Sequence, residues 1–432
     1  MKIFVEPNKN QWNALCLRPS EDKVTLNQTV SEILNEVKIN GDEALRIFNE
    51  RFQQVDANFD FVVSNSEFEK AEAAISAELK DAIDKAYNNI YTFHFAQKEG
   101  VAPIETDSGV TCWREQRGID SVGLYVPGGT APLFSTVLML GIPAQIAGCK
   151  SVQMCTPPNK EGNIHPAMLY AAKKCGISTI YKVGGAQAIG AMAYGTTSIA
   201  KCYKIFGPGN QFVTKAKELV SLQGCAIDMP AGPSEVLVFA DDTCIPAFVA
   251  SDLLSQAEHG ADSQVVLVGT CRKVIDACLK ELDAQIEQLP RKEMALKAIE
   301  NSKALVIGNI NLAWEFINEY APEHLIISSE NDEQYTAEVQ NAGSVFLGNY
   351  TPESAGDYAS GTNHTLPTSG YAKMYSGVNL ASFCTSITFQ KITKQGIQNL
   401  GATIEIMAEN EGLFAHKNAV SLRLKAIFDE KN

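Results

Sequence analysis

Short apolar runs alternate with segments of helical periodicity between residues 120 and 228, and the turns after these runs are rich in glycine and proline. The runs lie at residues 122–126, 152–156, 179–183, 203–206 and 225–227. Strands that alternate with helices along a chain join into a parallel sheet, which helices cover on both faces. This alternation constrains the fold more than any other feature of the sequence, and it predicts a doubly wound α/β domain.

A second block with the same alternation covers residues 235–346. It predicts a second parallel sheet, with strands at residues 236–239, 264–268, 304–307, 325–327 and 344–346. Residues 229–233 have the composition of a turn and indicate a hinge between the two blocks. The fold class that we expect is α/β, with two Rossmann-like, doubly wound domains. Neither block carries a complete G-x-G-x-x-G dinucleotide fingerprint directly after a strand.

Helical extensions flank the two blocks. Residues 25–97 are predominantly helical, and two helical patterns at 392–408 and 413–428 follow a strand-like run at 386–389. The C-terminal extension is too small to bury much apolar surface alone, so we expect it to dock on its own chain or on a partner subunit. Residues 348–377 are rich in Gly, Ser, Thr and Asn without a regular period, which predicts a long ordered loop.

The composition restricts the partners and the compartment. With 432 residues and 45% hydrophobic residues, the chain is long enough for two or more domains. The formal charge of −14 disfavours nucleic acid and anionic membranes, so we expect a small-molecule ligand. Eleven cysteines without a CxxC pair indicate a reducing compartment. The first residues do not have the apolar core of a signal peptide, and we expect a cytoplasmic protein.

Gln256 and His259 lie three residues apart near the end of a predicted helix, a spacing that places both side chains on one face. A residue between 241 and 243 would cap the start of this helix, and Pro246 suits its first turn. An amide and an imidazole on one face could bind a ligand. A histidine near a helix C-terminus is also commonly a capping cation, and the sequence alone leaves both roles open.

An acid and an imidazole, Glu323 and His324, directly precede a predicted strand. Both side chains are capable of general acid–base catalysis, and a polar pair in a surface loop is the alternative. Two other histidines also lie near carboxylates, in the pairs Asp357 with His364 and Glu411 with His416. Zinc binds imidazole nitrogen and carboxylate oxygen, but no short metal-binding motif is present. A metal site would need distant segments, which the spacing does not establish.

Polar residues also lie at three of the turns that follow strands in the first block. These residues are Tyr125, Gln187 and Asn210. A glycine turn that enters a helix can bind a phosphate through its free N–H groups, and the side chains nearby could hold a nucleotide. A tight turn without any ligand is an equally good interpretation of the sequence.

Several motifs together resemble the histidinol dehydrogenase family over nearly the full length of the chain. The motifs are VGLYVPGG at 122–129, VGGAQAI at 183–189, GPGN at 207–210, DMPAGPSE at 228–235, SQAEHG at 255–260, APEHL at 321–325 and SGTNH at 360–364, with a further match at 409–416. Any one of them is weakly diagnostic, but the full set is highly specific.

The resemblance implies a homodimer that depends on NAD and contains one zinc ion per subunit. Such an enzyme oxidises L-histidinol to L-histidine through L-histidinaldehyde, in two hydride transfers. Carried over by motif, the zinc ligands would be Gln256, His259, Asp357 and His416, the last from the neighbouring subunit. This arrangement would give the two subunits shared active sites and would explain where the C-terminal tail docks.

The resemblance also implies roles for the other candidate residues. Ser234, Glu411 and His324 would line the substrate site together with the four zinc ligands. His324 would be the general base, and Glu323 would activate the water that attacks the aldehyde. The NAD contacts would be Tyr125, Gln187 and Asn210.

The domain organisation that we expect has four parts. They are an N-terminal segment at 1–22, a first α/β domain at 23–121 and 233–378 with the zinc and substrate residues, an NAD-binding domain at 122–232, and a tail at 379–432 that docks on the partner subunit. Two other functions remain open on this scaffold. One is a zinc hydrolase that binds no dinucleotide, and the other is a non-catalytic nucleotide or metal sensor.

Overall fold

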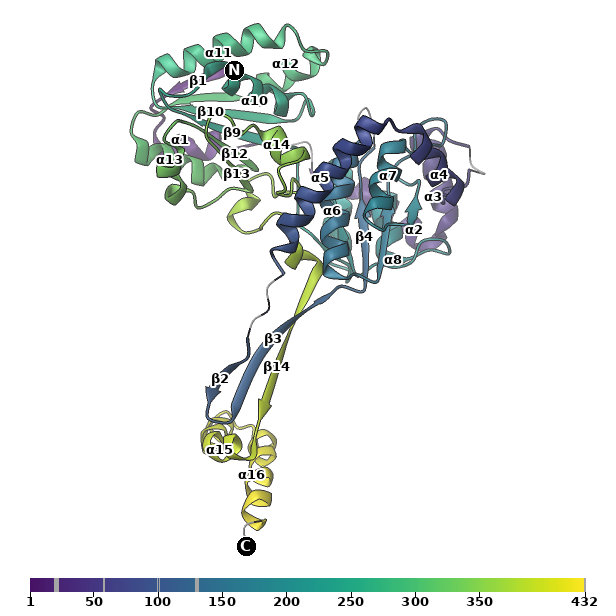
Figure 1. Ribbon diagram of the computed structural model, residues 1–432, viewed down its shortest axis with the longest axis vertical. Helices are drawn as coiled ribbons and strands as arrows, with labels where there is room; N and C mark the ends of the chain where they lie inside the picture. The colour runs from purple at the N-terminus through teal and green to yellow at the C-terminus, as the bar shows by residue number, and fades with distance from the viewer. Residues whose placement is uncertain (19–22, 57–58, 99, 101, 129–131, 431–432) are drawn as a thin grey trace. The chain divides into compact units, whose positions relative to one another are not determined.

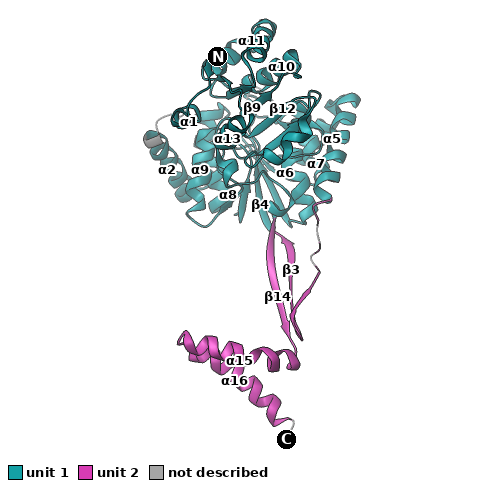
Figure 2. Cartoon of the chain, turned by 90° about the vertical axis from the view of Figure 1, so that its left-hand side faces the viewer, with its two compact units in different colours: residues 1–95, 119–383 teal, residues 96–118, 384–432 magenta. Residues whose placement is uncertain are grey.

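The computed structural model describes residues 1–18, 23–56, 59–98, 100, 102–128 and 132–430. Gly129, which ends one of the predicted turns, lies outside the described residues. The chain divides into two compact units, Met1–Phe95 with Ile119–Phe383 and Ala96–Gly118 with Cys384–Asn432 (Figure 2). The first unit contains both parallel sheets, and the second contains the C-terminal tail.

The first sheet confirms the predicted alternation. Its strands, all parallel, run in the order β6-β5-β4-β7-β8. Their bounds are β4 Ser121–Tyr125, β5 Ser151–Cys155, β6 Thr179–Tyr181, β7 Lys204–Phe206 and β8 Ala226–Ile227. The strand order reverses between β4 and β7, and ligands of doubly wound folds bind outside the carboxyl ends of strands at such a point.

Helices cover both faces of the first sheet. One core cluster joins alternate side chains of β4, such as Leu124, to α6 and α7, and the other joins Tyr125 to α8 and α9. The bounds of these helices are α6 Phe134–Ala147, α7 Pro166–Lys174, α8 Gly185–Tyr194 and α9 Gln211–Ser221. Adjacent residues of a strand point to opposite faces of the sheet. Each short apolar run therefore contributes side chains to the cores on both faces.

The second sheet has the same topology with one additional strand. Its parallel order is β1-β11-β10-β9-β12-β13. The bounds are β1 Lys2–Val5, β9 Glu235–Ala240, β10 Gln264–Gly269, β11 Lys303–Val306, β12 His324–Ser328 and β13 Ser344–Leu347. Sequence reasoning missed β1, which pairs with β11 and forms one edge of the sheet. The N-terminal segment is therefore part of the second sheet.

Figure 1 shows α10, α11 and α12 on one face of this sheet and α1 and α13 on the other. Val236 and Val238 of β9 pack with the first group, and Leu237 and Phe239 pack with the second. The helices are α1 Lys9–Leu15, α10 Pro246–Ala257, α11 Arg272–Ile286, α12 Lys292–Glu300 and α13 Ile310–Tyr320. The two doubly wound sheets of the predicted α/β fold class are thus confirmed.

The helices that precede the first sheet pack against the helices that cover it, whereas the expected domain boundaries grouped them with the second sheet. They are α2 Lys23–Asn40, α3 Asp42–Phe48, α4 Asn65–Ala74 and α5 Ala77–Phe95, with a π-helical turn at Asn49–Gln53. The apolar stripe of α2, which includes Val30, Leu34 and Val37, packs against Ile189 of α8. Figure 1 shows α5 beside α6, and the side chains of these two helices share a core.

The segment 348–377, predicted to be a loop, contains a short helix, α14 Glu353–Tyr358, and a 3-10 turn at Tyr371–Lys373. Further 3-10 turns lie at Asp332–Glu338 and Leu380–Phe383. The prediction of a loop without regular structure is therefore wrong over α14. A helix of this length has too few residues to display a helical period.

The second unit is a three-stranded antiparallel sheet with two helices. The strand order is β14-β3-β2, with bounds β2 Ile104–Asp107, β3 Val110–Gly118 and β14 Cys384–Ile392. The tail continues as α15 Lys394–Asn410 and α16 Phe414–Asp429, which pack together. Large apolar side chains of these two helices are exposed, namely Ile406, Met407, Phe414, Leu422 and Phe428. The tail by itself therefore buries little apolar surface.

No helix in the described ranges is both long enough and apolar enough to cross a membrane. The apolar helix α6 is part of a core cluster of the first sheet.

Gly207 follows β7 and has a φ of +126°, and a Cβ at this position would collide with the carbonyl oxygen of Tyr125. Gly224 also has a positive φ, +90°, but faces open space. Gly224→Ala should therefore lose only the ~1–2 kcal/mol of a left-handed residue with a side chain. Gly207→Ala should lose a further ~1–3 kcal/mol because the backbone must shift. Urea unfolding of both variants measures the difference, and equal losses would contradict the predicted collision.

Candidate functional site

Helix α10 returns the chain to the edge of the second sheet at which the strands begin. It crosses from the carboxyl end of β9 to the amino end of β10, so its last turn lies near that edge. Gln256 lies in this last turn and is fully buried, whereas His259 follows the end of the helix and is exposed. Neither polar atom of the Gln256 amide has a hydrogen-bond partner among the described residues.

The start of α10 differs from the expected cap. Pro246 occupies the first turn as predicted, but Ile245 is the N-cap and makes no side-chain hydrogen bond. Asp241, one of the predicted caps, instead accepts hydrogen bonds from the Thr243 hydroxyl at 2.6 Å and the Ser329 hydroxyl at 2.6 Å. These bonds fix the loop between β9 and α10 rather than the helix end.

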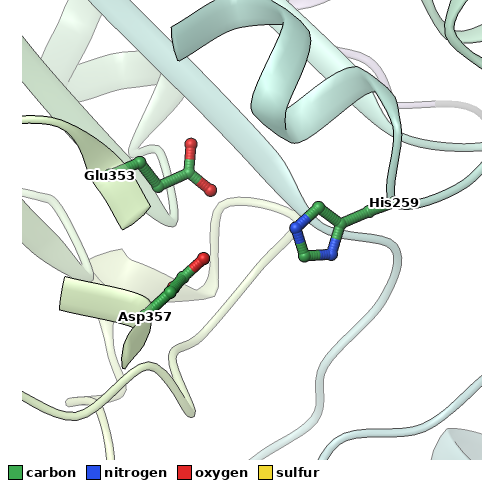
Figure 3. Close-up of side chains that lie close together, drawn as sticks. All are labelled: His259, Glu353 and Asp357. Atoms are coloured by element: carbon green, nitrogen blue, oxygen red, sulfur yellow. The ribbon is translucent and has the colours of Figure 1, made fainter. Parts of the chain in front are cut away.

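A possible metal-binding group forms where α10 and α14 meet. His259, Glu353 and Asp357 each offer one ligand atom, and these atoms lie within 4.8 Å of one another (Figure 3). His259 and Asp357 are two of the four predicted zinc ligands. Glu353 was missed because it lies in the segment predicted to be a loop. The signal was its i,i+4 spacing from Asp357, which places both carboxylates on one face of α14.

The unsatisfied polar atoms around this group fit a divalent cation. Glu353 is 1% exposed, and one of its carboxylate oxygens has no hydrogen-bond partner in the described part of the chain. Burial raises the pKa of Glu353 well above its usual value, and the charges of Asp357 and Glu323 raise it further. A buried carboxylate without a partner is costly, and a cation would compensate it. Imidazole nitrogen with carboxylate and amide oxygen is a donor set that zinc accepts.

Glu323 and His324 are buried at the start of β12, which excludes the surface-loop interpretation of this pair. The backbone N–H of Glu235 donates a hydrogen bond to a Glu323 carboxylate oxygen at 2.9 Å. The Nδ1 atom of His324 lies 3.3 Å from the carbonyl oxygen of Glu235. A carbonyl can only accept, so this contact places the proton on Nδ1 and leaves Nε2 as the basic nitrogen.

The basic nitrogen of His324 faces the metal-binding group. Nε2 lies 3.7 Å from an Asp357 carboxylate oxygen, and Nδ1 lies 3.6 Å from one of Glu353. Burial lowers the pKa of His324 to about 4, so the imidazole is neutral at physiological pH. Burial raises the pKa of Glu323 well above its usual value. The neutral imidazole of His324 therefore lies beside the carboxyl group of Glu323, whose basicity is raised.

His364 supports α14 from the following loop. Its Nδ1 atom lies 2.9 Å from the backbone carbonyl of Asp357, and its Nε2 atom lies 3.1 Å from the Thr136 hydroxyl. Burial lowers the pKa of His364, which is also neutral. The loop histidine therefore fixes the position of Asp357.

The three residues predicted to contact NAD line one cavity of about 1190 Å³. It opens at the carboxyl ends of the strands of the first sheet, where Tyr125 ends β4. The Tyr125 hydroxyl accepts a hydrogen bond from the Gly185 N–H at 3.0 Å, and burial raises the pKa of Tyr125 to about 12. Asn210 caps α9, and the buried Gln187 amide nitrogen has no partner in the described residues.

The remaining predicted site residues belong to different units of the chain. Ser234 directly precedes β9 and is half-buried. Glu411 and His416 belong to the second unit, where Glu411 caps the end of α15 and His416 lies in the first turn of α16. Both of these side chains are exposed.

The fold has two doubly wound sheets. One has a large cavity at its strand ends, and the other has a buried acid–base pair beside possible metal ligands. These features define an α/β enzyme. A family model for histidinol dehydrogenase matches residues 16–424. The chain is 56% identical over 427 residues to a histidinol dehydrogenase of Bacteroides thetaiotaomicron, covering 99% of this chain and all of that protein. The chain belongs to the histidinol dehydrogenase family.

More distant relatives and a crystal structure agree with this assignment. The chloroplastic histidinol dehydrogenase of Arabidopsis thaliana is 52% identical over 425 residues, 98% of this chain and 91% of that protein. The crystal structure of histidinol dehydrogenase from Elizabethkingia anophelis has a TM-score of 0.96 at 55% identity, covering 99% of this chain and 98% of that one. The chain is thus an oxidoreductase of histidine biosynthesis by family.

Glu353→Gln should weaken zinc binding roughly 10- to 100-fold, because the amide removes a buried negative charge from the group around the ion. Glu338→Gln, an exposed glutamate of the same unit, is the matched control and should bind zinc like the parent protein. Competition with a chromogenic chelator measures both affinities. Equal affinities for the parent and Glu353→Gln would exclude Glu353 from the metal site.

Proposed function

We propose that this protein catalyses the last step of histidine biosynthesis, the NAD-dependent oxidation of L-histidinol to L-histidine through L-histidinaldehyde. The observation that carries the proposal is the buried Glu323–His324 pair beside His259, Glu353 and Asp357, in a chain of this family. The reaction consumes one water and two NAD, and it yields two NADH, the carboxylate and protons.

The donor atoms on α10 and α14 support a zinc site. Gln256, His259 and Asp357 would hold the ion together with the partner subunit's His416, and Glu353 lies beside them. Zinc bound there would supply a Lewis acid that anchors and orients the substrate. Ser234 and Glu411 complete the substrate site in this proposal.

His324 moves the proton of the reacting carbinol. With Nδ1 held by the Glu235 carbonyl, Nε2 accepts the hydroxyl proton as the hydride leaves for NAD, which gives the aldehyde. Glu323 then takes a proton from the water that attacks the aldehyde carbon, while His324 returns its proton to the aldehyde oxygen, so that the hydrate forms and His324 is again neutral. The raised pKa of Glu323 makes its carboxylate a stronger base than an exposed one. His324 removes the hydroxyl proton of the resulting hydrate as the second hydride leaves.

The cavity of the first sheet supports the NAD assignment. Tyr125, Gln187 and Asn210 meet at the reversal of strand order, where doubly wound folds bind nucleotides. NAD bound there would supply the hydride acceptor for both oxidations. The amide nitrogen of Gln187, which has no hydrogen-bond partner among the described residues, could donate to such a ligand.

A homodimer with shared active sites accounts for the tail. The apolar side chains exposed on α15 and α16 need a partner surface, and the exposed His416 is free to complete a site in another subunit. We place the protein in the cytoplasm, in line with its eleven free cysteines. Nucleic acid and membrane are not partners in this proposal, because the net charge of −14 disfavours both.

The proposal is tested by adding L-histidinol and NAD to the zinc-loaded protein and following NADH by absorbance. We expect two NADH per histidinol consumed. If a folded, zinc-loaded dimer formed no NADH, the proposal would be refuted. Hydrolysis of an ester or amide substrate by the same preparation would favour a zinc hydrolase. Binding of NAD or zinc without turnover of any substrate would indicate a sensor.

His324→Asn should lower the rate of hydride transfer by roughly 10² or more, as expected when a general base is lost, and should spare zinc content. Glu323→Gln is the matched comparison, since it should slow aldehyde oxidation more than alcohol oxidation. Single-turnover kinetics with histidinol and with histidinaldehyde separate the two steps. An unchanged rate in His324→Asn, or equal slowing of both steps in Glu323→Gln, would remove that residue from its role.

Shared sites predict complementation between inactive variants. A dimer that combines a His416→Asn subunit with a His324→Asn subunit has one site with both residues intact, so the mixture should recover part of the parent activity. Hybrids are isolated with two different affinity tags before the assay. Inactive hybrids of confirmed composition would show that each site uses the tail of its own chain.

A further inference from the structure

An arginine from the N-terminal segment is bound to the residue that holds the acid–base pair. The guanidinium of Arg18 donates two hydrogen bonds to the Glu235 carboxylate, from Nε at 2.7 Å and from Nη2 at 2.8 Å. Nη2 also donates to the Tyr320 carbonyl at 2.7 Å, and the guanidinium lies 3.7 Å above the Tyr320 ring. The Glu235 side chain is 1% exposed, so Arg18 is the countercharge of a buried carboxylate.

The backbone of Glu235 contacts both members of the pair. Its N–H donates to Glu323 at 2.9 Å, and its carbonyl lies 3.3 Å from Nδ1 of His324. The first contact fixes one carboxylate oxygen of Glu323. The second sets the tautomer that leaves Nε2 of His324 basic. A single residue therefore positions both groups through its peptide atoms, while its side chain is held by Arg18.

Removing Arg18 would leave a buried carboxylate without a countercharge. Such a group must either take up a proton or move toward water, because an unpaired charge is strongly disfavoured in the interior. Glu235 is the first residue of β9 and pairs there with Gln264 of β10, whereas the pairing with β12 begins one residue later, at Val236. A movement of its side chain would therefore shift the peptide atoms that hold Glu323 and His324.

We propose that Arg18 is a positioning residue for the Glu323–His324 pair and acts through Glu235. The inference rests on the proposed function, since it assigns Arg18 a part in the same proton transfers. Arg18 hydrogen-bonds to Glu235, Cys16 and Tyr320, and in the described part of the chain it makes no hydrogen bond to the possible metal ligands. Its effect should therefore fall on the rate and not on metal binding.

The N-terminal segment retains other anchors when Arg18 is replaced. The Lys303 ammonium donates to the carbonyl of Leu17 at 3.0 Å and also binds the carbonyl of Leu15. Strand β1 pairs with β11, and Trp12 packs in the core of the second sheet. A variant at position 18 should therefore fold with the segment in place, and its kinetic effect can be measured.

The test compares Arg18→Gln, Arg18→Lys, Glu235→Gln and the double variant Arg18→Gln/Glu235→Gln. Arg18→Gln should lower kcat for histidinol roughly 10- to 100-fold, as loss of an outer contact to a catalytic histidine does, with KM and zinc content close to the parent values. Arg18→Lys should recover part of kcat because it keeps the charge. The double variant should have a kcat no lower than that of the slower single variant, because both changes remove the same Arg18–Glu235 interaction.

Lys9→Gln is the control, because it removes an exposed ion pair with Glu315 from the same segment and should leave kcat unchanged. A parent-like kcat in Arg18→Gln would overturn the inference, as would losses that multiply in the double variant. The inference would also be overturned if the activity of the variant fell only in proportion to its fraction of folded protein, which thermal unfolding measures. If the parent protein itself forms no NADH from histidinol, the proposed function fails and not this inference alone.

Discussion

The parallel pairing of β9 with β12 is the constraint on which the site depends. In this register His324 lies opposite Val236, so Glu235 and Glu323 meet at the edge where both strands begin. Parallel neighbours require a crossover, and α10 therefore returns from the far end of β9 to the same edge. The end of α10, with Gln256 and His259, therefore lies at the same end of the sheet as the acid–base pair. In the first sheet the candidate ligand residues lie at the opposite, carboxyl ends of the strands, as is usual for doubly wound folds.

The electrostatics of this edge indicate binding and chemistry rather than stability. Glu323, Glu353 and Asp357 surround His324, and burial raises the pKa of the nearby Asp252 to about 7. A group of buried carboxylates repels itself, and a fold selected only for stability would replace it with apolar side chains. The proposed cation would compensate this charge and would satisfy atoms of Gln256 and Glu353 that have no hydrogen-bond partner in the described part of the chain. Arg18 compensates the adjacent Glu235 from the protein side.

The sequence predicted those parts of the fold that depend on local pattern. The ten core strands were found because each is a short apolar run between turns, as at Val236 to Phe239. Strand β3 was missed because its exposed and half-buried residues, such as Arg114 and Gln116, break any alternation. Glu353 was missed because α14 has a single turn and a half of helix and lies among glycines and serines. The Arg18–Glu235 pair joins residues 217 positions apart, and no local pattern encodes such a contact.

A crystal structure of the zinc-loaded protein with anomalous data at the zinc edge tests the central claim most directly. We expect one zinc peak per subunit between α10 and α14, about 2.0–2.2 Å from a His259 nitrogen and an Asp357 oxygen. Gln256 and the partner subunit's His416 should complete the coordination. A zinc peak elsewhere, or one at this place with His416 of the same chain or no tail residue bound, would show that the proposed shared zinc site is wrong.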